Sequence, residues 1–211
     1  MILQDTGSTF EPAPSGVHVA RLYRLIDLGS QSSNYNGQAR HNRKLLFTFE
    51  LLGDERMDDG QPFSISRRFT ATLGEKGALR PFLESWRGKK YTPDELKAGL
   101  PLEKMLGAYG LINLVENERE GRIYSNIASI SPLPRGMEKP EGHNSLQLFD
   151  LSAPDWDVFA NLSERLQETI LDSAEGRTAY NASGATPSNT TPGNTAAATG
   201  AGVEFDDDVP F

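Results

Sequence analysis

Residues 86–91 interleave two aromatic rings with three cations, in the order Trp-Arg-Gly-Lys-Lys-Tyr. Aromatic rings can stack on unpaired bases, and cations can neutralise the phosphates between them; together they bind a single strand with little sequence preference. Gly88 carries no Cβ, so it lets a ligand come close to the backbone. The segment is therefore a candidate site for single-stranded nucleic acid, with these side chains as its members: Trp86, Arg87, Lys89, Lys90 and Tyr91.

Trp86 has a second role open to it. Leu79, Phe82 and Leu83 precede it at helical spacing, so the indole can equally be the last core residue of an amphipathic helix. The four residues that follow Trp86 in the segment lie beyond this stripe and are the stronger candidates.

Cations and tyrosines on three expected strands and one polar loop extend the candidate site. Arg67 and Arg68 interrupt a strand of apolar and serine residues, and neighbours in a strand point to opposite faces. Arg68 is thus expected on the surface, whereas Arg67 is in register with inward residues unless a bulge reorients it or it lies at the rim. For each tyrosine, a half-buried core ring is the alternative role. The additional candidates are Tyr23, Tyr35, Arg40, Arg43, Lys44, Arg67, Arg68, Arg122 and Tyr124.

The last eight residues form a second kind of candidate site. Three aspartates stand between Phe205 and a terminal Val-Pro-Phe, and Pro210 disfavours a helix or a central strand there. An acidic peptide with aromatic ends suits capture in a basic pocket with an apolar floor. The alternative is a tail that only adds solubility. The residues expected to dock on a partner are Phe205, Asp206, Asp207, Asp208, Val209, Pro210 and Phe211.

Charge is divided unevenly along the chain. Residues 1–140 carry 19 Lys and Arg against 17 Asp and Glu, a net of +2, whereas residues 141–211 carry 2 against 12, a net of −10, and together these give −8. A body with basic clusters and an acidic tail is compatible with nucleic-acid binding, which the overall pI near 5.0 would by itself argue against.

Several function classes are disfavoured by composition. The chain has no cysteine, so disulfides, thiolate metal sites and cysteine nucleophiles are excluded. Residues 1–10 do not resemble a secretory signal, and no apolar run reaches the ~20 residues of a membrane span. The acidic run at 54–59 lacks calcium-loop spacing. We therefore expect a cytoplasmic protein that is not an enzyme, uses no cofactor or metal and does not enter a membrane.

Periodicity predicts three strands, a helical segment and two more strands. The expected strands span 16–28, 43–52, 62–73, 107–115 and 121–130, with helices over 75–86 and from a capping box at Thr92–Glu95. This order is that of an oligonucleotide-binding (OB) barrel, a small five-stranded Greek-key barrel, although other five-stranded α+β folds share it. We therefore predict a mostly β fold: an OB barrel with a helix between strands three and four, a helical C-terminal extension and a disordered acidic tail.

The expected organisation has five parts. Residues 1–15 read as an irregular arm, 16–135 as the OB domain, 136–176 as a helical satellite, 177–203 as a flexible linker and 204–211 as the docking tip. The satellite is expected to hold helices over 155–159 and 162–173 and to pack on the barrel or on a second subunit, so a homodimer is possible. The linker is rich in Ala, Thr, Gly, Asn, Ser and Pro, a composition that cannot offset its ordering entropy by burial.

Three segments resemble a bacteriophage-encoded family of single-stranded-DNA-binding proteins: VARLYRLIDLGSQ at 19–31, LRPFLESWRGKKYT at 79–92 and YSNIASISPLP at 124–134. The resemblance covers about residues 16–175 and implies an OB barrel that coats single strands during replication or recombination in an infected or lysogenic bacterial host. The tip is similar to that of the bacterial single-stranded-DNA-binding proteins, which recruits replication, recombination and repair enzymes. The strand-one sequence usual in those cellular proteins is missing here, so only the tip is carried over, onto Phe205 to Phe211.

Two rival functions stay open. One is a strand-annealing or recombination mediator that binds two strands. The other is an interaction adaptor whose barrel binds a protein rather than DNA.

Overall fold

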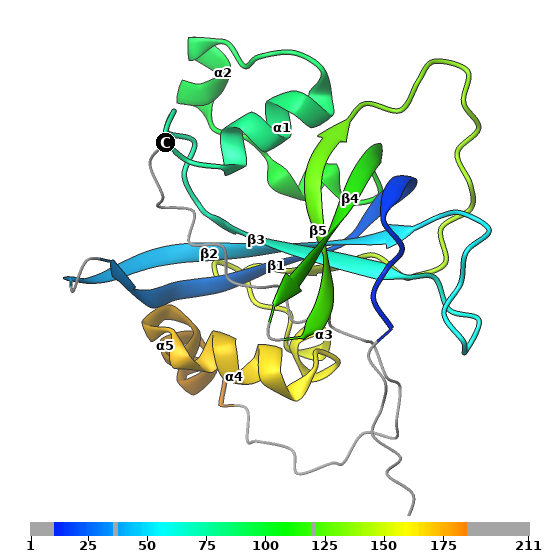
Figure 1. The fold of residues 1–211 in the computed structure, drawn as a ribbon. Helices are drawn as coiled ribbons and strands as arrows, with labels where there is room; N and C mark the ends of the chain where they lie inside the picture. The colour runs from blue at the N-terminus through cyan, green and yellow to red at the C-terminus, as the bar shows by residue number, and fades with distance from the viewer. Residues whose placement is uncertain (1–10, 36–37, 120, 185–211) are drawn as a thin grey trace, which may run out of the picture.

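The structure, a computed structural model, describes residues 11–35, 38–119 and 121–184 (Figure 1). The strands are β1 (Gly16–Tyr35), β2 (Gln38–Leu51), β3 (Ser64–Thr70), β4 (Tyr109–Arg119), β5 (Arg122–Ser131) and β6 (Gln147–Phe149). The helices are α1 (Leu79–Arg87), α2 (Pro93–Ala98), the short 3₁₀ helix η1 (Leu102–Met105), α3 (Trp156–Ala160), α4 (Glu164–Asp172) and α5 (Ala174–Ser183).

Within these residues the strands join one sheet in the order β3-β2-β1-β4-β5, with β6 beside β1. Consecutive strands along this order pair antiparallel, and β6 pairs with β1 in parallel. The five predicted strands are thus present. The short β6 was not predicted, because three residues are too few to show a period.

β1 is long enough to serve several partners. Its first part pairs with β4, and its middle lies between β2 and β6. Beyond Gly29, β1 and β2 continue as a two-stranded arm that projects from the sheet at the left of Figure 1. The polar loop expected between the predicted strands at 16–28 and 43–52 is instead a hairpin, since the pairing runs unbroken from Ser30↔Arg43 to Tyr35↔Gln38. Polar residues here belong to strands that no core covers, so the apolar alternation is missing.

The main core lies between one face of the sheet and α1. The predicted strand at 43–52 is present as β2, and its Phe47 and Phe49 are fully buried and contact α1 rings edge-on, those of Phe82 and Trp86. Each buried apolar side chain of this size stabilises the fold by about 1.5–3 kcal/mol. Helix α1 begins four residues later than the predicted 75 and ends at Gly88, which has the positive φ of 76° typical of a helix end.

A second apolar cluster covers the opposite face of β1 and β2. Ile26, Leu28 and Leu46 face the satellite there, and Phe149, Leu166 and Ile170 contribute from its side. The satellite therefore packs on the sheet of its own chain, with α4 and α5 lying below β1 and β2 in Figure 1.

Helix α5 corrects the predicted end of the satellite. The satellite was expected to end at residue 176 and the linker to begin at 177, yet α5 runs to Ser183. Ser173 caps the helix by accepting the Gly176 N–H at 2.9 Å, and a Cβ at position 176 would overlap the Ile170 carbonyl. The glycine thus serves the close approach of α4 and α5. The rest of the predicted linker lies outside the described residues.

The part of the predicted N-terminal arm that is described, 11–15, is irregular but packed. Ala13 is buried in the main core, and its carbonyl accepts the Ser125 hydroxyl from β5. Glu11 accepts the backbone N–H of Asp58 at 3.2 Å. These contacts hold the segment against the loop between β2 and β3.

Candidate nucleic-acid interface

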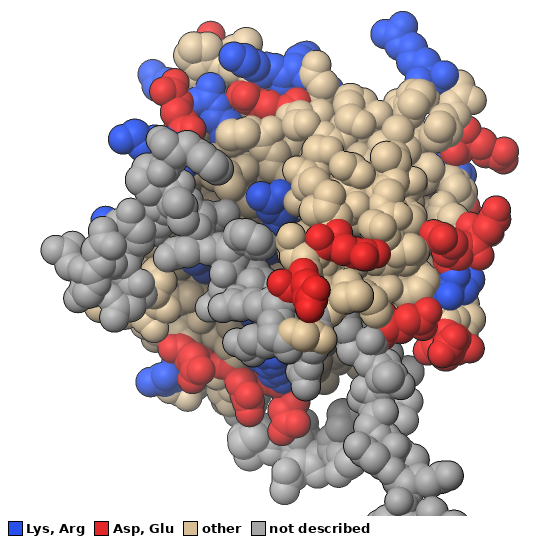
Figure 2. All heavy atoms as spheres, in the orientation of Figure 1, with Lys and Arg blue, Asp and Glu red and all other residues tan. Residues whose placement is uncertain are grey.

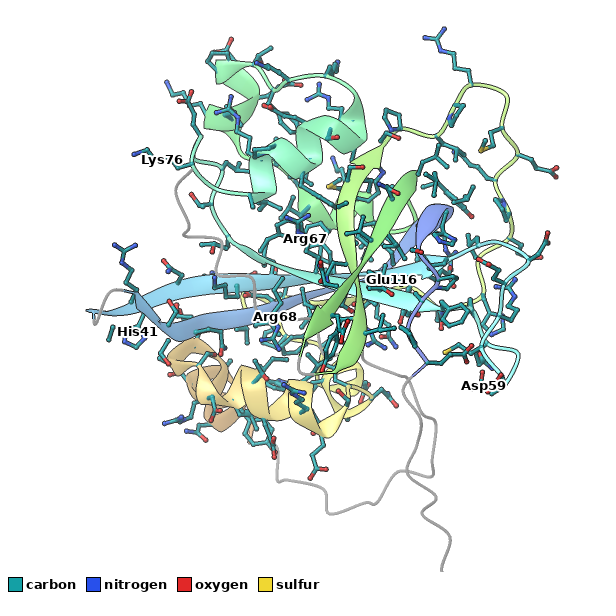
Figure 3. All side chains as sticks on the ribbon, viewed as in Figure 1. His41, Asp59, Arg67, Arg68, Lys76 and Glu116 are labelled. Carbon is teal, nitrogen blue, oxygen red and sulfur yellow. The ribbon has the colours of Figure 1, made fainter. Side chains whose placement is uncertain are left out.

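The β1–β2 arm carries the first group of candidate cations. Arg40 and His41 are exposed, and Figure 3 shows His41 far out on the arm. Lys44 lies opposite Thr70 of β3 and donates to its hydroxyl at 2.9 Å. Tyr35 lies at the end of the hairpin, and its side chain is outside the described part of the chain.

Arg43 is tied to a buried carboxylate at the base of the arm. Its Nε donates to both oxygens of Asp27, at 3.1 and 3.0 Å, and its Nη2 also contacts that carboxylate. The hydrogen bond with Asp27, which is only 5% exposed, raises the pKa of Arg43 above its ordinary value. Part of the charge of Arg43 is therefore balanced within the protein.

The two arginines of β3 lie on opposite sides of the sheet, as Figure 3 shows. The register between β2 and β3 has no shift, so no bulge turns Arg67 outward. Its guanidinium lies over the rings of Phe69 and Phe82, at 5.0 and 5.5 Å, and donates to the Ile127 carbonyl of β5 at 3.2 Å. The bulge alternative is therefore wrong, and the half-buried Arg67 lies against aromatic residues of the main core. Arg68 is half-buried opposite Leu46.

Trp86 belongs to the core, so of its two alternative roles the core position is the one observed. The side chain is 5% exposed, and its ring packs edge-on against Phe49 at 5.3 Å. Its indole N–H donates to the Tyr109 carbonyl at 2.8 Å, and a Cβ at Gly110 would overlap the ring. With its N–H bonded and little of its side chain exposed, the indole is placed to pack in the core rather than to stack on a base.

The residues after Trp86 form a surface cluster between α1 and α2. Arg87 lies over the ring of Tyr91 at 4.5 Å and donates to the Glu95 carboxylate at 2.5 Å. The bond to Arg87, followed by one from the Thr92 backbone, lowers the pKa of Glu95 from its ordinary 4.5 to about 2. Lys89 and Lys90 are exposed. They are therefore better placed than Arg87 to contact a phosphate.

The predicted capping box at the start of α2 is confirmed and shapes this cluster. The Thr92 hydroxyl accepts the Glu95 N–H at 3.2 Å, and the Glu95 carboxylate accepts the Thr92 N–H at 2.8 Å. Glu95 thus serves two partners, the cap and Arg87.

A pocket of about 560 Å³ opens beside the cluster, between α1, α2, η1 and the start of β4. Its walls are mainly apolar and aromatic and include Trp86, Tyr91, Leu100, Leu102, Met105 and Tyr109. The Arg87–Glu95 ion pair also lines it.

The remaining tyrosine and arginine candidates are dispersed. Tyr23 is 5% exposed, and its hydroxyl lies 3.4 Å from Ser64, so the core alternative holds for this ring. Tyr124 is half-buried on β5 opposite Asn117. Arg122 begins β5, but its side chain is outside the described residues. The docking tip, 204–211, lies outside them too.

Charge on the visible face follows these elements. Figure 2 shows Lys and Arg side chains over α1 and α2 at the top of the view, mixed with a few acidic ones. Asp and Glu dominate the right side and the lower edge near α4. Basic character is therefore local rather than general.

Sequence reasoning missed the acidic residues that hold the basic arm. Asp27 is a lone carboxylate in the otherwise apolar stretch LIDL, and that isolation was an available signal for a buried ion pair. Glu175, which accepts hydrogen bonds from Ser30, gave no such signal, because its partner is 145 residues away.

No protein-family model matches the chain, and a search of curated proteins finds no match either. Among the described residues, no helix is long and apolar enough to cross a membrane.

Proposed function

We propose that this protein binds single-stranded DNA with little sequence preference, through an OB barrel whose β1–β2 hairpin is the basic arm. In such barrels the face of strands two and three and the loops after strands one and four bind oligonucleotides. The pairing order β3-β2-β1-β4-β5, together with the Arg67 bond to Ile127 between the two end strands, supports this fold.

The observation that carries the proposal is the basic arm itself. Arg40, His41 and Arg43 lie on the arm, which no core covers, and Lys44 lies at its base opposite Thr70 of β3. A projecting hairpin with this composition suits contact with a phosphate backbone, whose neutralisation releases counterions.

The candidate residues are expected to contribute unequally to DNA binding. Arg40, Lys89 and Lys90 are exposed and are assigned to phosphate contacts. Arg43 and Arg87 are bonded to carboxylates, which balance part of their charge. Tyr91, held under Arg87 at one wall of the pocket, is the ring that we assign to base stacking. Each stacked base contributes about 1–3 kcal/mol.

The tip extends this function to partner recruitment. The acidic, Phe-ended peptide at 204–211 would bring replication, recombination or repair enzymes to the coated strand. The resemblance to bacteriophage-encoded single-stranded-DNA-binding proteins supports a role in phage replication or recombination, with partners from the host or the phage.

A gel-shift comparison tests the DNA-binding proposal and its rivals. A thirty-nucleotide oligo(dT) should be shifted by the full chain, and a duplex of the same length should be shifted much more weakly. An annealing mediator would in addition accelerate pairing of complementary strands. An adaptor would shift neither oligonucleotide, and that result would end the proposal.

A further inference from the structure

The β1–β2 arm leaves the sheet where an irregularity of the strand pairing bends β1. The pairing of β1 with β2 shifts register between Asp27 and Gly29, as a bulge does. Gly29 has a positive φ of 70°, and a Cβ there would overlap the Ser173 side chain. A glycine is thus required both by the backbone conformation and by the turn between α4 and α5 that packs against it.

The satellite grips the first residues of the arm beyond this bend. The Glu175 carboxylate accepts the Ser30 N–H at 3.1 Å and the Ser30 hydroxyl at 2.5 Å. These bonds lower the pKa of Glu175, the Ser30 hydroxyl having the larger effect. The Gln31 side chain then donates to the Thr169 carbonyl of α4 at 2.9 Å. Two consecutive arm residues, Ser30 and Gln31, are therefore hydrogen-bonded to α5 and α4.

A buried carboxylate joins the two strands of the arm at the same level. Asp27 accepts the Gly29 N–H at 3.0 Å and also the guanidinium of Arg43 on β2. A change in the direction of β1 at this point would therefore carry β2 with it. Asp27 thus links β1 and β2 at the bend, and the turn between α4 and α5 packs against this point.

We propose that the α4–α5 turn is a brace that sets the direction of the basic arm, and that Glu175 is a positioning residue for single-stranded-DNA binding. The second half of this inference rests on the proposed function; the first half does not. It gives the satellite a role within its own chain. The arm is presented to the strand already oriented, so that little ordering is required on binding.

A substitution of Glu175 distinguishes the effect of arm orientation on DNA affinity from the effect of charge, because the two change the affinity in opposite directions. Glu175→Gln removes a negative charge close to Arg43, and by charge alone this change would tighten DNA binding. Loss of the brace has the opposite effect, because only the fraction of chains with a correctly placed arm binds the strand. We expect about a five-fold loss of oligo(dT) affinity in this variant, of the order that such a population penalty produces.

The matched variants sharpen this comparison. Asp172→Asn removes the same charge from an exposed residue at the end of α4, so it should leave affinity unchanged or slightly higher. Ser30→Ala keeps every charge and removes the hydroxyl that donates to the Glu175 carboxylate. It should therefore weaken oligo(dT) binding, as Glu175→Gln does.

The brace itself is measured without DNA. Since the chain has no cysteine, spin labels can be placed at Ala39→Cys on the arm and Glu168→Cys on α4, both exposed positions. The distance distribution between them should be narrow in the otherwise unchanged chain and should broaden in Glu175→Gln and Ser30→Ala. An unchanged distribution in both variants would overturn the brace.

The two halves of the proposal fail in different ways. A broadened distribution with undiminished oligo(dT) affinity would overturn the positioning role of Glu175 while leaving the brace. A parent chain that does not bind oligo(dT) at all would overturn the proposed function and the positioning role together, and the label distances would still decide the brace.

Discussion

The Arg67 guanidinium on β3 donates a hydrogen bond to the Ile127 carbonyl on β5, 60 residues away along the chain. These strands are the two ends of the pairing order, so this side chain links edges that lie far apart within the sheet. The same guanidinium lies over the rings of Phe69 and Phe82. Arg67 is therefore a structural residue first, whatever it adds to binding.

Arg67→Met should destabilise the fold while keeping most of the side-chain volume. A hydrogen bond from a charged donor contributes about 1.5–3 kcal/mol and a cation–π contact about 0.5–2 kcal/mol. We expect a loss of roughly 2–3 kcal/mol in the free energy of unfolding, because these terms overlap. Urea unfolding measures it as a lower midpoint with an unchanged slope. The exposed Arg56→Ala in the β2–β3 loop is the control and should stay within about 0.5 kcal/mol.

Trp86→Phe should separate a core residue from a stacking residue. The variant keeps a ring in the core but loses the hydrogen bond to Tyr109, which costs about 1 kcal/mol of folding stability. Oligo(dT) affinity should not change in this variant. In Tyr91→Ala, by contrast, we expect a loss of about 1–3 kcal/mol of binding free energy, the range for one stacked base. Isothermal titration calorimetry of both variants with oligo(dT) checks this. Weaker oligo(dT) binding by Trp86→Phe would show that the indole takes part in DNA binding after all.

Glu95 should titrate far below an ordinary glutamate. Its pKa in the folded chain is about 2, against an ordinary 4.5, chiefly because of the bond to Arg87. Since the folded-state pKa is lowered, the stabilisation is fully present above pH 4.5 and is lost as pH falls from there toward about 2. Side-chain carboxyl shifts from NMR measure this pKa directly. A midpoint near 4 or higher would show that the Arg87 bond does not persist in solution.

Arg87→Ala is the matched variant for that titration. It removes the largest cause of the shift and leaves the bond from the Thr92 backbone. The pKa of Glu95 should rise toward its ordinary value without reaching it.

The acidic tip should compete with DNA for the basic surface through charge alone. Asp206, Asp207 and Asp208 carry much of the tail's negative charge, so changing all three to Asn should tighten oligo(dT) binding modestly at low salt. At high salt the effect should vanish, because screening removes it. Phe205→Ala with Phe211→Ala keeps the charge and is the control, with unchanged DNA affinity. Equal oligo(dT) affinities at low salt for the parent, the triple Asn variant and the double Ala variant would contradict competition by the tip.

The sequence predicted the parts of the fold that have a clear apolar period. The alternation of Leu45, Phe47 and Phe49 placed β2, and the spacing of Leu79, Phe82 and Leu83 placed α1. It failed where tertiary contacts decide. The arm beyond Gly29 has no apolar period because no core covers it. Gly176 lies inside a helix rather than at its end, and a glycine is needed there because the Ile170 carbonyl of α4 lies too close for a Cβ.

The candidate site shows the same division. The interleaved rings and cations at 86–91 marked a surface cluster correctly from Arg87 onward, but the helical spacing that ends at Trp86 placed that ring in the core. The pairing of Arg43 with Asp27 and of Ser30 with Glu175 joins distant residues, which a single sequence does not reveal.

The most direct test of DNA binding is a salt-titrated isotherm with thirty-nucleotide oligo(dT), on the full chain and on Arg40→Ala with Lys89→Ala and Lys90→Ala. Log affinity should fall linearly with log salt, with a slope of about −0.7 for each phosphate contact, and the triple variant should have a shallower slope. Arg56→Ala, which removes one positive charge elsewhere, should keep the parent slope. No detectable binding by the parent chain at low salt, or equal slopes for the parent and the triple variant, would contradict a strand held by these cations.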